Sequence, residues 1–191
     1  GAMLRLSDFL DEHPDGRAEA ESLAQAAVRE SRAAFGDAHP ETAASMLHLG
    51  FMLFEHGRGA EGEPLIRQAL AIQQRVWGPS HVVVASGMTT LARVLMRDGY
   101  SAEAERLLTE AARIEAASLG TKHSVYAGTL TYLADALALR GALDSAETLC
   151  RRAIAIRTES FGPDQTITAL TWGGLAAVLT KQRRFAEADS I

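Results

Sequence analysis

The chain has 191 residues, of which 47% are hydrophobic and 23% are charged, and its net charge is −5. The composition is that of an ordinary folded protein, and the mild acidity argues against nucleic-acid binding, which usually needs a basic face. No apolar run is long enough to predict a membrane span. The single cysteine, Cys150, provides neither a disulfide framework nor a thiolate metal site. We expect a cytoplasmic protein.

The N-terminal part of the chain is less regular than the rest of the sequence. Residues 1–3 are typical of a cloning scar left by tag removal, and we exclude them from the fold. Residues 4–35 are predicted to hold an irregular helix within about 3–13 and a regular helix over roughly 17–35. We expect the chain to be part of a longer protein.

A turn sequence then recurs with a constant spacing of 42 residues. Its glycines are Gly36, Gly78, Gly120 and Gly162. A histidine comes three residues after each of the first three. A period of 20 to 50 residues indicates a solenoid or an array of repeats. The spacing divides the chain into three full repeats, 36–77, 78–119 and 120–161, and a partial repeat, 162–191.

Each repeat is predicted to begin with a helix, which we call helix A. Its alanines and leucines recur at spacings of three and four, so they share one helical face. The positions that repeat are Ala43, Ala85, Ala127 and Ala169, then Leu49, Leu91, Leu133 and Leu175, then Leu53, Leu95, Leu137 and Leu179. The expected ranges are 41–56, 82–98, 124–140 and 166–182.

A second helix, helix B, is predicted over 17–35, 60–77, 102–119, 144–161 and a stub at 185–191. Glycine ends helix A in three copies, where a left-handed residue is favoured, and Arg183 takes this place in the fourth. An acidic column, Glu21, Glu63, Glu105 and Glu147, is expected in the first turn of helix B. Asp144 and Glu147 resemble a capping pair, and Pro64 is expected in an opening turn.

These columns resemble the tetratricopeptide repeat. In the fourth copy the pattern of large, leucine and small residues is carried by Trp172, Leu175, Ala176, Leu179 and Ala188. The usual unit has about 34 residues. The 42-residue unit, with Gly-x-x-His-Pro at Gly36–Pro40, is similar to the kinesin light chain type, which many bacterial signalling proteins also carry. The resemblance implies an all-α, right-handed superhelical solenoid of antiparallel helix–turn–helix repeats.

The resemblance also implies a protein-binding scaffold rather than an enzyme, within a larger signalling or assembly protein. One departure matters. The asparagine pair of kinesin light chains is replaced by Leu47-His48, Thr89-Thr90, Thr131-Tyr132 and Gly173-Gly174. The peptide-binding role of those asparagines is therefore not implied here. Of the basic set that chaperone-binding members use, only Arg93 is present, so chaperone-tail binding is not expected.

The resemblance places the ligand groove on the face of helix A opposite its core face. The candidate residues there are Leu47, His48, Phe51, Phe54, Thr89, Thr90, Arg93, Met96, Arg97, Tyr132 and Asp135. They predict an apolar, aromatic end and a basic middle, flanked by acidic Glu55 and Asp135. The expected partner is a protein or short peptide with an apolar anchor and acidic residues. Alternatively, Phe51 and Phe54 pack inward against neighbouring helices.

The histidines at 39, 81 and 123 recur in register, but columns of stacked helices lie about 10 Å apart, too far for one metal ion. We therefore interpret them as turn residues that hydrogen-bond at the start of helix A, and we expect no metal or cofactor. Trp77 and Phe161 are expected to join one repeat to the next. Self-association through the partial last repeat is the alternative function.

Overall fold

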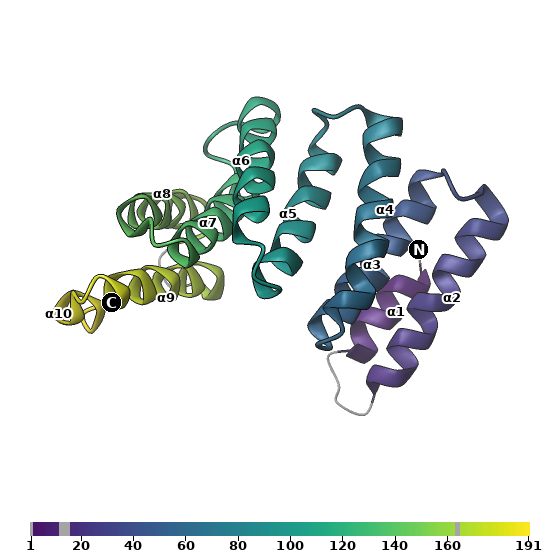
Figure 1. Cartoon of the computed structure of the whole chain (residues 1–191), viewed down its shortest axis with the longest axis horizontal. Coiled ribbons are helices and arrows are strands. Elements are labelled where there is room, and N and C mark those ends of the chain that lie inside the picture. The colour runs from purple at the N-terminus through teal and green to yellow at the C-terminus, as the bar shows by residue number, and fades with distance from the viewer. Residues whose placement is uncertain (1, 12–15, 163–164) are drawn as a thin grey trace. The chain divides into compact units, whose positions relative to one another are not determined.

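The computed structural model describes residues 2–11, 16–162 and 165–191. Throughout this part of the chain every regular element is an α-helix, and the helices follow one another in sequence (Figure 1). They are α1 (Ala2–Asp11), α2 (Arg17–Phe35), α3 (Pro40–Glu55), α4 (Gly59–Trp77), α5 (Val82–Arg97), α6 (Ser101–Ser118), α7 (Ser124–Leu139), α8 (Leu143–Phe161), α9 (Thr166–Lys181) and α10 (Phe185–Ala188). The predicted all-α class is confirmed. None of the described helices is long and apolar enough to cross a membrane.

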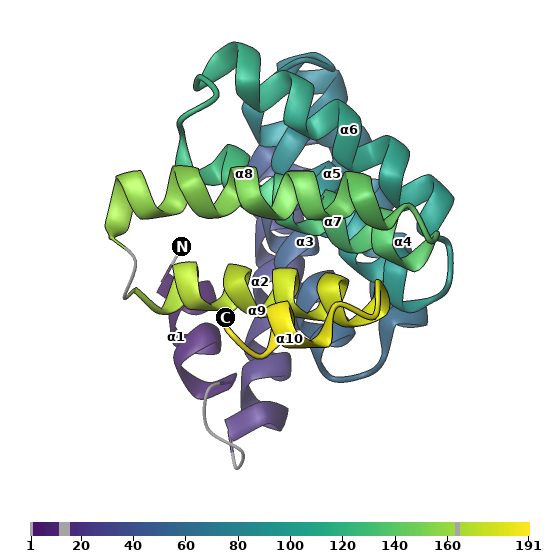
Figure 2. The same ribbon diagram turned by 90° about the vertical axis from the view of Figure 1, so that its left-hand side faces the viewer.

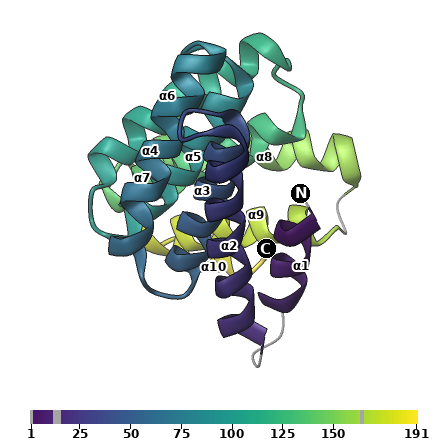
Figure 3. The same cartoon turned by 90° about the vertical axis from the view of Figure 1, so that its right-hand side faces the viewer.

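The chain forms two compact units, Gly1–Val94 and Leu95–Ile191. In the second unit, α6 packs on α7, α7 on α8 and α8 on α9, and the short α10 lies beside the later part of α9 (Figure 2). In the first unit, α1 packs on α2, α2 on α3 and α3 on α4 (Figure 3). Each unit is thus a stack of helical hairpins, as the 42-residue repeat predicts.

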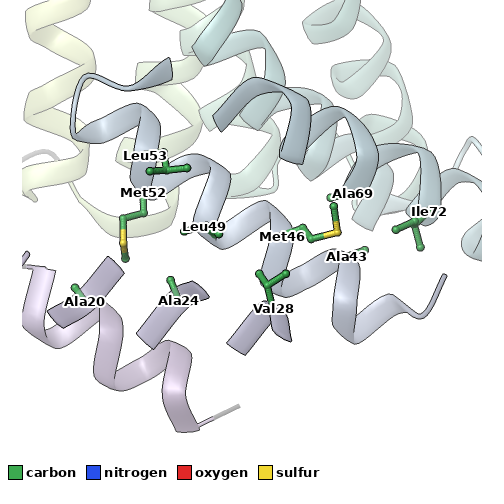
Figure 4. Packing of buried hydrophobic residues seen from close by; sticks show 10 residues of the cluster. All are labelled: Ala20, Ala24, Val28, Ala43, Met46, Leu49, Met52, Leu53, Ala69 and Ile72. Atoms are coloured by element: carbon green, nitrogen blue, oxygen red, sulfur yellow. The ribbon is translucent and has the colours of Figure 1, made fainter. Parts of the chain in front are cut away.

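Small residues on helix B let it approach helix A closely. In the first unit, Ala20, Ala24 and Val28 of α2 lie against the larger side chains of α3 (Figure 4). Those larger side chains are Met46, Leu49, Met52 and Leu53. A hairpin cannot bury this face alone, so stacking provides the core, and each large side chain contributes about 1.5–3 kcal/mol when fully buried.

The recurring turn before helix A has a backbone that requires glycine. Gly36, Gly78 and Gly162 have φ of 87°, 80° and 89° and ψ of 168°, 157° and 163°, a region that only glycine adopts readily. Three residues later, His39 and His123 cap α3 and α7. Each accepts, through Nδ1, the backbone N–H two residues on, at 3.2 Å. His81 accepts from Val83 in the same way at 3.2 Å. The predicted capping role is confirmed.

Trp77 and Phe161, which the sequence predicts to join one repeat to the next, are both about half exposed. Trp77 stacks on His81 at the start of the following repeat, with ring centroids 5.0 Å apart, and Phe35 stacks on His39 in the same way at 4.7 Å. The aromatic residue thus holds the capping histidine of its own turn, because the turn folds the two rings together.

Two local predictions for helix B are wrong. Asp144 does not cap α8, whose N-cap Ala142 makes no side-chain cap bond; Asp144 accepts a hydrogen bond from Gln182 instead. Pro64 lies inside α4 rather than in its opening turn, because the helix already begins at Gly59. Proline there leaves one carbonyl of the preceding turn without its helical donor.

The acidic column joins neighbouring repeats. It starts in the second turn of helix B, since α2, α4, α6 and α8 begin four residues before it. Arg58 bonds Glu21 of the preceding helix B and Glu61 of its own, both at 2.7 Å. Arg184 bonds Glu147 and Glu187 in the same pattern, both at 2.6 Å. A pairing with the next repeat, rather than the helix dipole, therefore explains Glu21 and Glu147, whereas Glu63 pairs with Arg67 of its own helix at 2.7 Å.

A second polar column is buried between helix B and the following helix A. Its members change character from repeat to repeat: Ser31, Gln73, Glu115 and Arg157. They face the buried or small positions Ser45, Gly87, Thr129 and Thr171. Arg157 donates to the hydroxyl of Thr171 and to the carbonyl of Ile167, and Thr129 bonds Glu115. The varied chemistry makes each of these interfaces distinct.

Candidate functional site

The first unit brings three of the inner-face residues into direct contact. The guanidinium carbon of Arg93, on α5, lies 4.3 Å from the centroid of the Phe51 ring on α3. The same guanidinium bonds Glu55 Oε1 at 3.1 Å. The Arg93 and Glu55 side chains are 30% and 46% exposed, and Phe51 is half-buried. We call these residues the Phe51–Arg93–Glu55 cluster. It offers a cation over an aromatic face, both within reach of solvent.

Phe54 lies inside the first unit rather than on this surface. It is 7% exposed, and its ring centroid is 5.7 Å from that of Phe51. Phe54 therefore follows the alternative prediction, in which its side chain packs inward against neighbouring helices. Phe51, one helical turn earlier, keeps an exposed edge.

Helix α1 covers the beginning of the predicted face. Ser7 Oγ lies 3.4 Å from His48 Nε2, and Asp8 Oδ1 lies 3.5 Å from His48 Nδ1. Further along, Asp11 Oδ1 lies 2.6 Å from His56 Nε2. Leu47 packs against the core cluster of α2, α3 and α4. His48 and Leu47 therefore serve contacts within the unit, which the irregular sequence of α1 did not reveal.

The other candidates are distributed over α5 and α7. Thr89 and Thr90 are half-buried on α5, and the Thr90 hydroxyl donates to the carbonyl of Ser86 in its own helix. Arg93 and Arg97 lie one helical turn apart on α5, and the boundary between the two units falls between them, after Val94. Arg97 is exposed and Met96 is half-buried.

In the second unit, Tyr132 and Asp135 are half-buried on α7. Burial raises the pKa of Asp135, and the nearby charge of Lys181, on α9, opposes that rise. Lys181 Nζ also approaches the carbonyl of Ala138 at 3.5 Å. The inner face of the second unit thus pairs an acid with a base instead of continuing a basic surface.

The described residues show no metal-binding arrangement. Nowhere among them do three or more histidine, cysteine, aspartate or glutamate side chains gather as ligands would. Cys150 is fully buried, and burial, with the charges of Asp135 and Glu147, raises the pKa of its thiol to about 11. Such a thiol is protonated at neutral pH and is a poor nucleophile.

Comparison with known families decides the class of the protein. The sequence model described as tetratricopeptide repeat matches residues 43–117 and 125–191. The chain belongs to the tetratricopeptide repeat family. The predicted resemblance is confirmed, and the family generally mediates protein interactions and is typically non-catalytic. No curated protein sequence matches the chain.

Solved structures show the same fold at low sequence identity. A single-substitution variant of a putative kinesin light chain with nearly identical TPR-like repeats from Podosopora anserina has a TM-score of 0.83 and 23% identity, over 99% of this chain and 89% of that one. BtubC (BKLC) from P. vanneervenii has a TM-score of 0.81 and 21% identity, over 97% and 73%. The apo form of RapI has a TM-score of 0.71 and 15% identity, over 97% and 50%. These likenesses concern the fold alone.

Proposed function

We propose that this tetratricopeptide repeat protein is a protein-binding scaffold that takes a short peptide segment on the α3–α5 face of its first unit. We infer that it works within a larger, bacterial signalling or assembly protein. The observation that carries the binding proposal is the Phe51–Arg93–Glu55 cluster. It combines a partly exposed aromatic ring with a cation at the positions where the repeat pattern does not require burial.

The cluster fits a peptide with a bulky apolar residue next to an acidic one. The apolar residue would pack on the exposed edge of Phe51, and the acidic residue would take the Arg93 guanidinium as a charge-assisted partner. The bond to Glu55 does not prevent this, because a solvent-exposed ion pair contributes only about 0–1 kcal/mol and is readily exchanged. Glu55 would then disfavour a second acid on its own side, which favours one peptide direction.

A displayed peptide library selected on the whole chain tests the proposal. We expect enrichment of peptides with an aromatic or large aliphatic residue beside aspartate or glutamate. The double variant Glu55→Arg with Arg93→Glu keeps an ion pair but reverses its polarity, so selection should shift to basic residues. Phe51→Ala should weaken binding of the wild-type-selected peptides. Binding should also weaken with rising salt, because the contact is exposed.

A matched control comes from helix α6. Glu110 and Arg113 of the second unit form an exposed ion pair, at 2.7 Å, and neither belongs to the Phe51–Arg93–Glu55 cluster. The double variant Glu110→Arg with Arg113→Glu should select the same peptides as the wild type. Phe54→Ala is unsuitable as a test, because truncating a buried phenylalanine costs about 3–5 kcal/mol of stability. If the swap at 55 and 93 leaves the selected peptides unchanged, the proposed site is wrong.

Self-association is a second candidate, favoured by one observation on α9. The column alanines Ala43, Ala85 and Ala127 are fully buried, but Ala169 is exposed. The short helix α10 lies beside the later part of α9 (Figure 2). Nearby, Leu170 is 70% exposed. A second copy of the chain would cover this apolar face.

Sedimentation over a concentration series separates this candidate from peptide binding. The wild type should show a rising mass with concentration, and Ala169→Glu should remain a monomer with the melting temperature retained. A wild-type chain that is monomeric over the whole series would exclude self-association and would leave the peptide proposal untouched.

A further inference from the structure

A groove of about 800 Å³ lies in the first unit, away from the Phe51–Arg93–Glu55 cluster. The last turns of α2 and α4, the turn after α2, and the buried side of α3 form its walls. The residues that matter are Arg32, Asp37, Met46, Gln68, Ile72 and Arg75. Its volume falls within the range of about 300–1,000 Å³ that small-molecule sites occupy.

Two arginines, Arg32 and Arg75, line the groove, but among the described residues only one carboxylate, that of Asp37, does so. Arg32 Nε bonds Asp37 Oδ1 at 2.9 Å, so that charge is balanced. Arg75 makes no hydrogen bond or ion pair with the other described residues. The last-turn position of both arginines suits the helix dipole. The helix dipole favours a basic residue at the end of each helix, but it does not explain why the two arginines line the same groove.

The floor of the groove is apolar. Met46 is almost fully buried and Ile72 is largely buried, and both present atoms to the groove. Arg32 Nη2 lies 3.9 Å from the sulfur of Met46, which places the cationic and apolar surfaces in direct contact. A ligand that suits both surfaces has an anionic head and an apolar body.

The equivalent positions in the second unit are joined by an ion pair. Two repeat periods after Ala38 and Arg75, which both line the first groove, lie Lys122 and Glu159. Lys122 Nζ bonds Glu159 Oε1 at 2.7 Å, joining the turn to helix B. In the first unit alanine and arginine stand at these positions, so the bridge cannot form. The same fold therefore leaves a cation facing an open groove.

We propose that this groove binds a small organic anion with a single oxyanion head and a short apolar body. The head, a carboxylate or a phosphate, bonds Arg75, whose planar guanidinium suits either group. Gln68 can donate a further hydrogen bond, and the apolar body lies over Met46 and Ile72. The site is separate from the peptide face, so either proposal can fail alone.

Calorimetric titration of the whole chain tests this site with four probes: hexanoate, hexyl phosphate, hexanol and acetate. We expect binding of hexanoate or hexyl phosphate, with the stronger of the two identifying the head. Hexanol lacks the head, and acetate lacks the apolar body. Both should bind at least about tenfold more weakly, because a charged hydrogen bond contributes about 1.5–3 kcal/mol and each buried methylene about 0.8 kcal/mol.

Three variants locate the binding. Arg75→Gln should weaken the better anion at least about tenfold. Ala38→Glu places a carboxylate at the position of Lys122, where it can pair with Arg75 and exclude the anion. Arg113→Gln, which replaces an exposed arginine on α6, should not change the affinity for the anion. Equal binding of hexanoate and hexanol, no binding of either anion, or full binding by Arg75→Gln with its melting temperature retained would each overturn the proposal.

Discussion

Gly62 of α4 lies so close to Gly50 of α3 that neither position has room for a side chain. A Cβ on Gly62 would lie 2.2 Å from the carbonyl oxygen of Gly50. The two residues occupy the columns that hold buried alanines, Ala104 and Ala92, in the next repeat. The α3–α4 crossing is thus tighter than the general pattern of small residues requires.

Gly62→Ala should therefore destabilise the first unit. The new methyl group meets backbone rather than a flexible side chain, and overpacking of this kind costs about 1–3 kcal/mol. Gly173→Ala is the control, because a Cβ there meets nothing within 4 Å and alanine favours helix by about 0.5–1 kcal/mol. Urea denaturation of both variants checks this. Equal stability of the two would mean that the helices separate easily at residue 62.

Arg183→Gly should stabilise the end of the second unit. Arg183 has φ of 63°, and it is the non-glycine residue with positive φ among the residues that the structure describes. Gly57, Gly99 and Gly141 stand at the same position in the earlier repeats, with φ of 81°, 88° and 83°. A left-handed non-glycine residue costs about 1–3 kcal/mol, partly offset by the greater freedom of unfolded glycine. A net gain of about 1 kcal/mol is expected in thermal or urea unfolding, and a loss would contradict it.

The period and the helix bounds were predictable because they depend on local patterns. Glycine at 36, 78, 120 and 162, together with alanine and leucine at helical spacing, determined each helix to within about two residues, the stub aside. The roles of histidine at 39, 81 and 123 followed from the same register.

The contacts between helices were not predictable in the same way. Phe51 and Phe54 are both aromatic residues on the outer part of one helix, yet one is buried and the other is half-buried beneath Arg93. The difference in burial arises from how α3 packs against its neighbouring helices, and the repeat pattern of a single sequence does not contain that information. The pairing of Arg58 with Glu21, across 37 residues, was missed for the same reason. The groove beside Arg75 is lined by side chains from α2, α3 and α4, so no single column of the sequence could predict it either.

Cys150 should resist alkylation while the second unit is folded. It is fully buried, and its raised thiol pKa of about 11 leaves only about one thiolate per thousand thiols near pH 8. Iodoacetamide should therefore label it only as urea unfolds the chain, with the same midpoint as circular dichroism. Asp135→Asn removes a nearby negative charge and should lower the thiol pKa without exposing the sulfur. Rapid labelling of the folded wild type would contradict the buried position.

Glu115 should make the second unit less stable as pH rises. Its side chain is 1% exposed, and its Oε2 has no hydrogen-bond partner among the described atoms. Burial raises its pKa, and the hydrogen bond from Thr129 opposes that rise only in part. The folded protein therefore holds this proton to a higher pH than the unfolded chain, whose glutamates titrate near about 4.3. The free energy of unfolding should fall as pH rises from about 4 through the raised pKa.

Glu115→Gln tests this dependence, because the amide keeps the shape and cannot ionise. Urea denaturation over a pH series should show a higher free energy of unfolding for the variant near neutral pH and a flatter profile between about pH 4 and 7. Glu110→Gln is the matched control on the same helix. Its exposed carboxylate pairs with Arg113, which lowers its pKa, so its small contribution has the opposite sign and is lost on acidification. If the Glu115→Gln profile parallels that of the wild type, the carboxyl group is not buried as the structure places it.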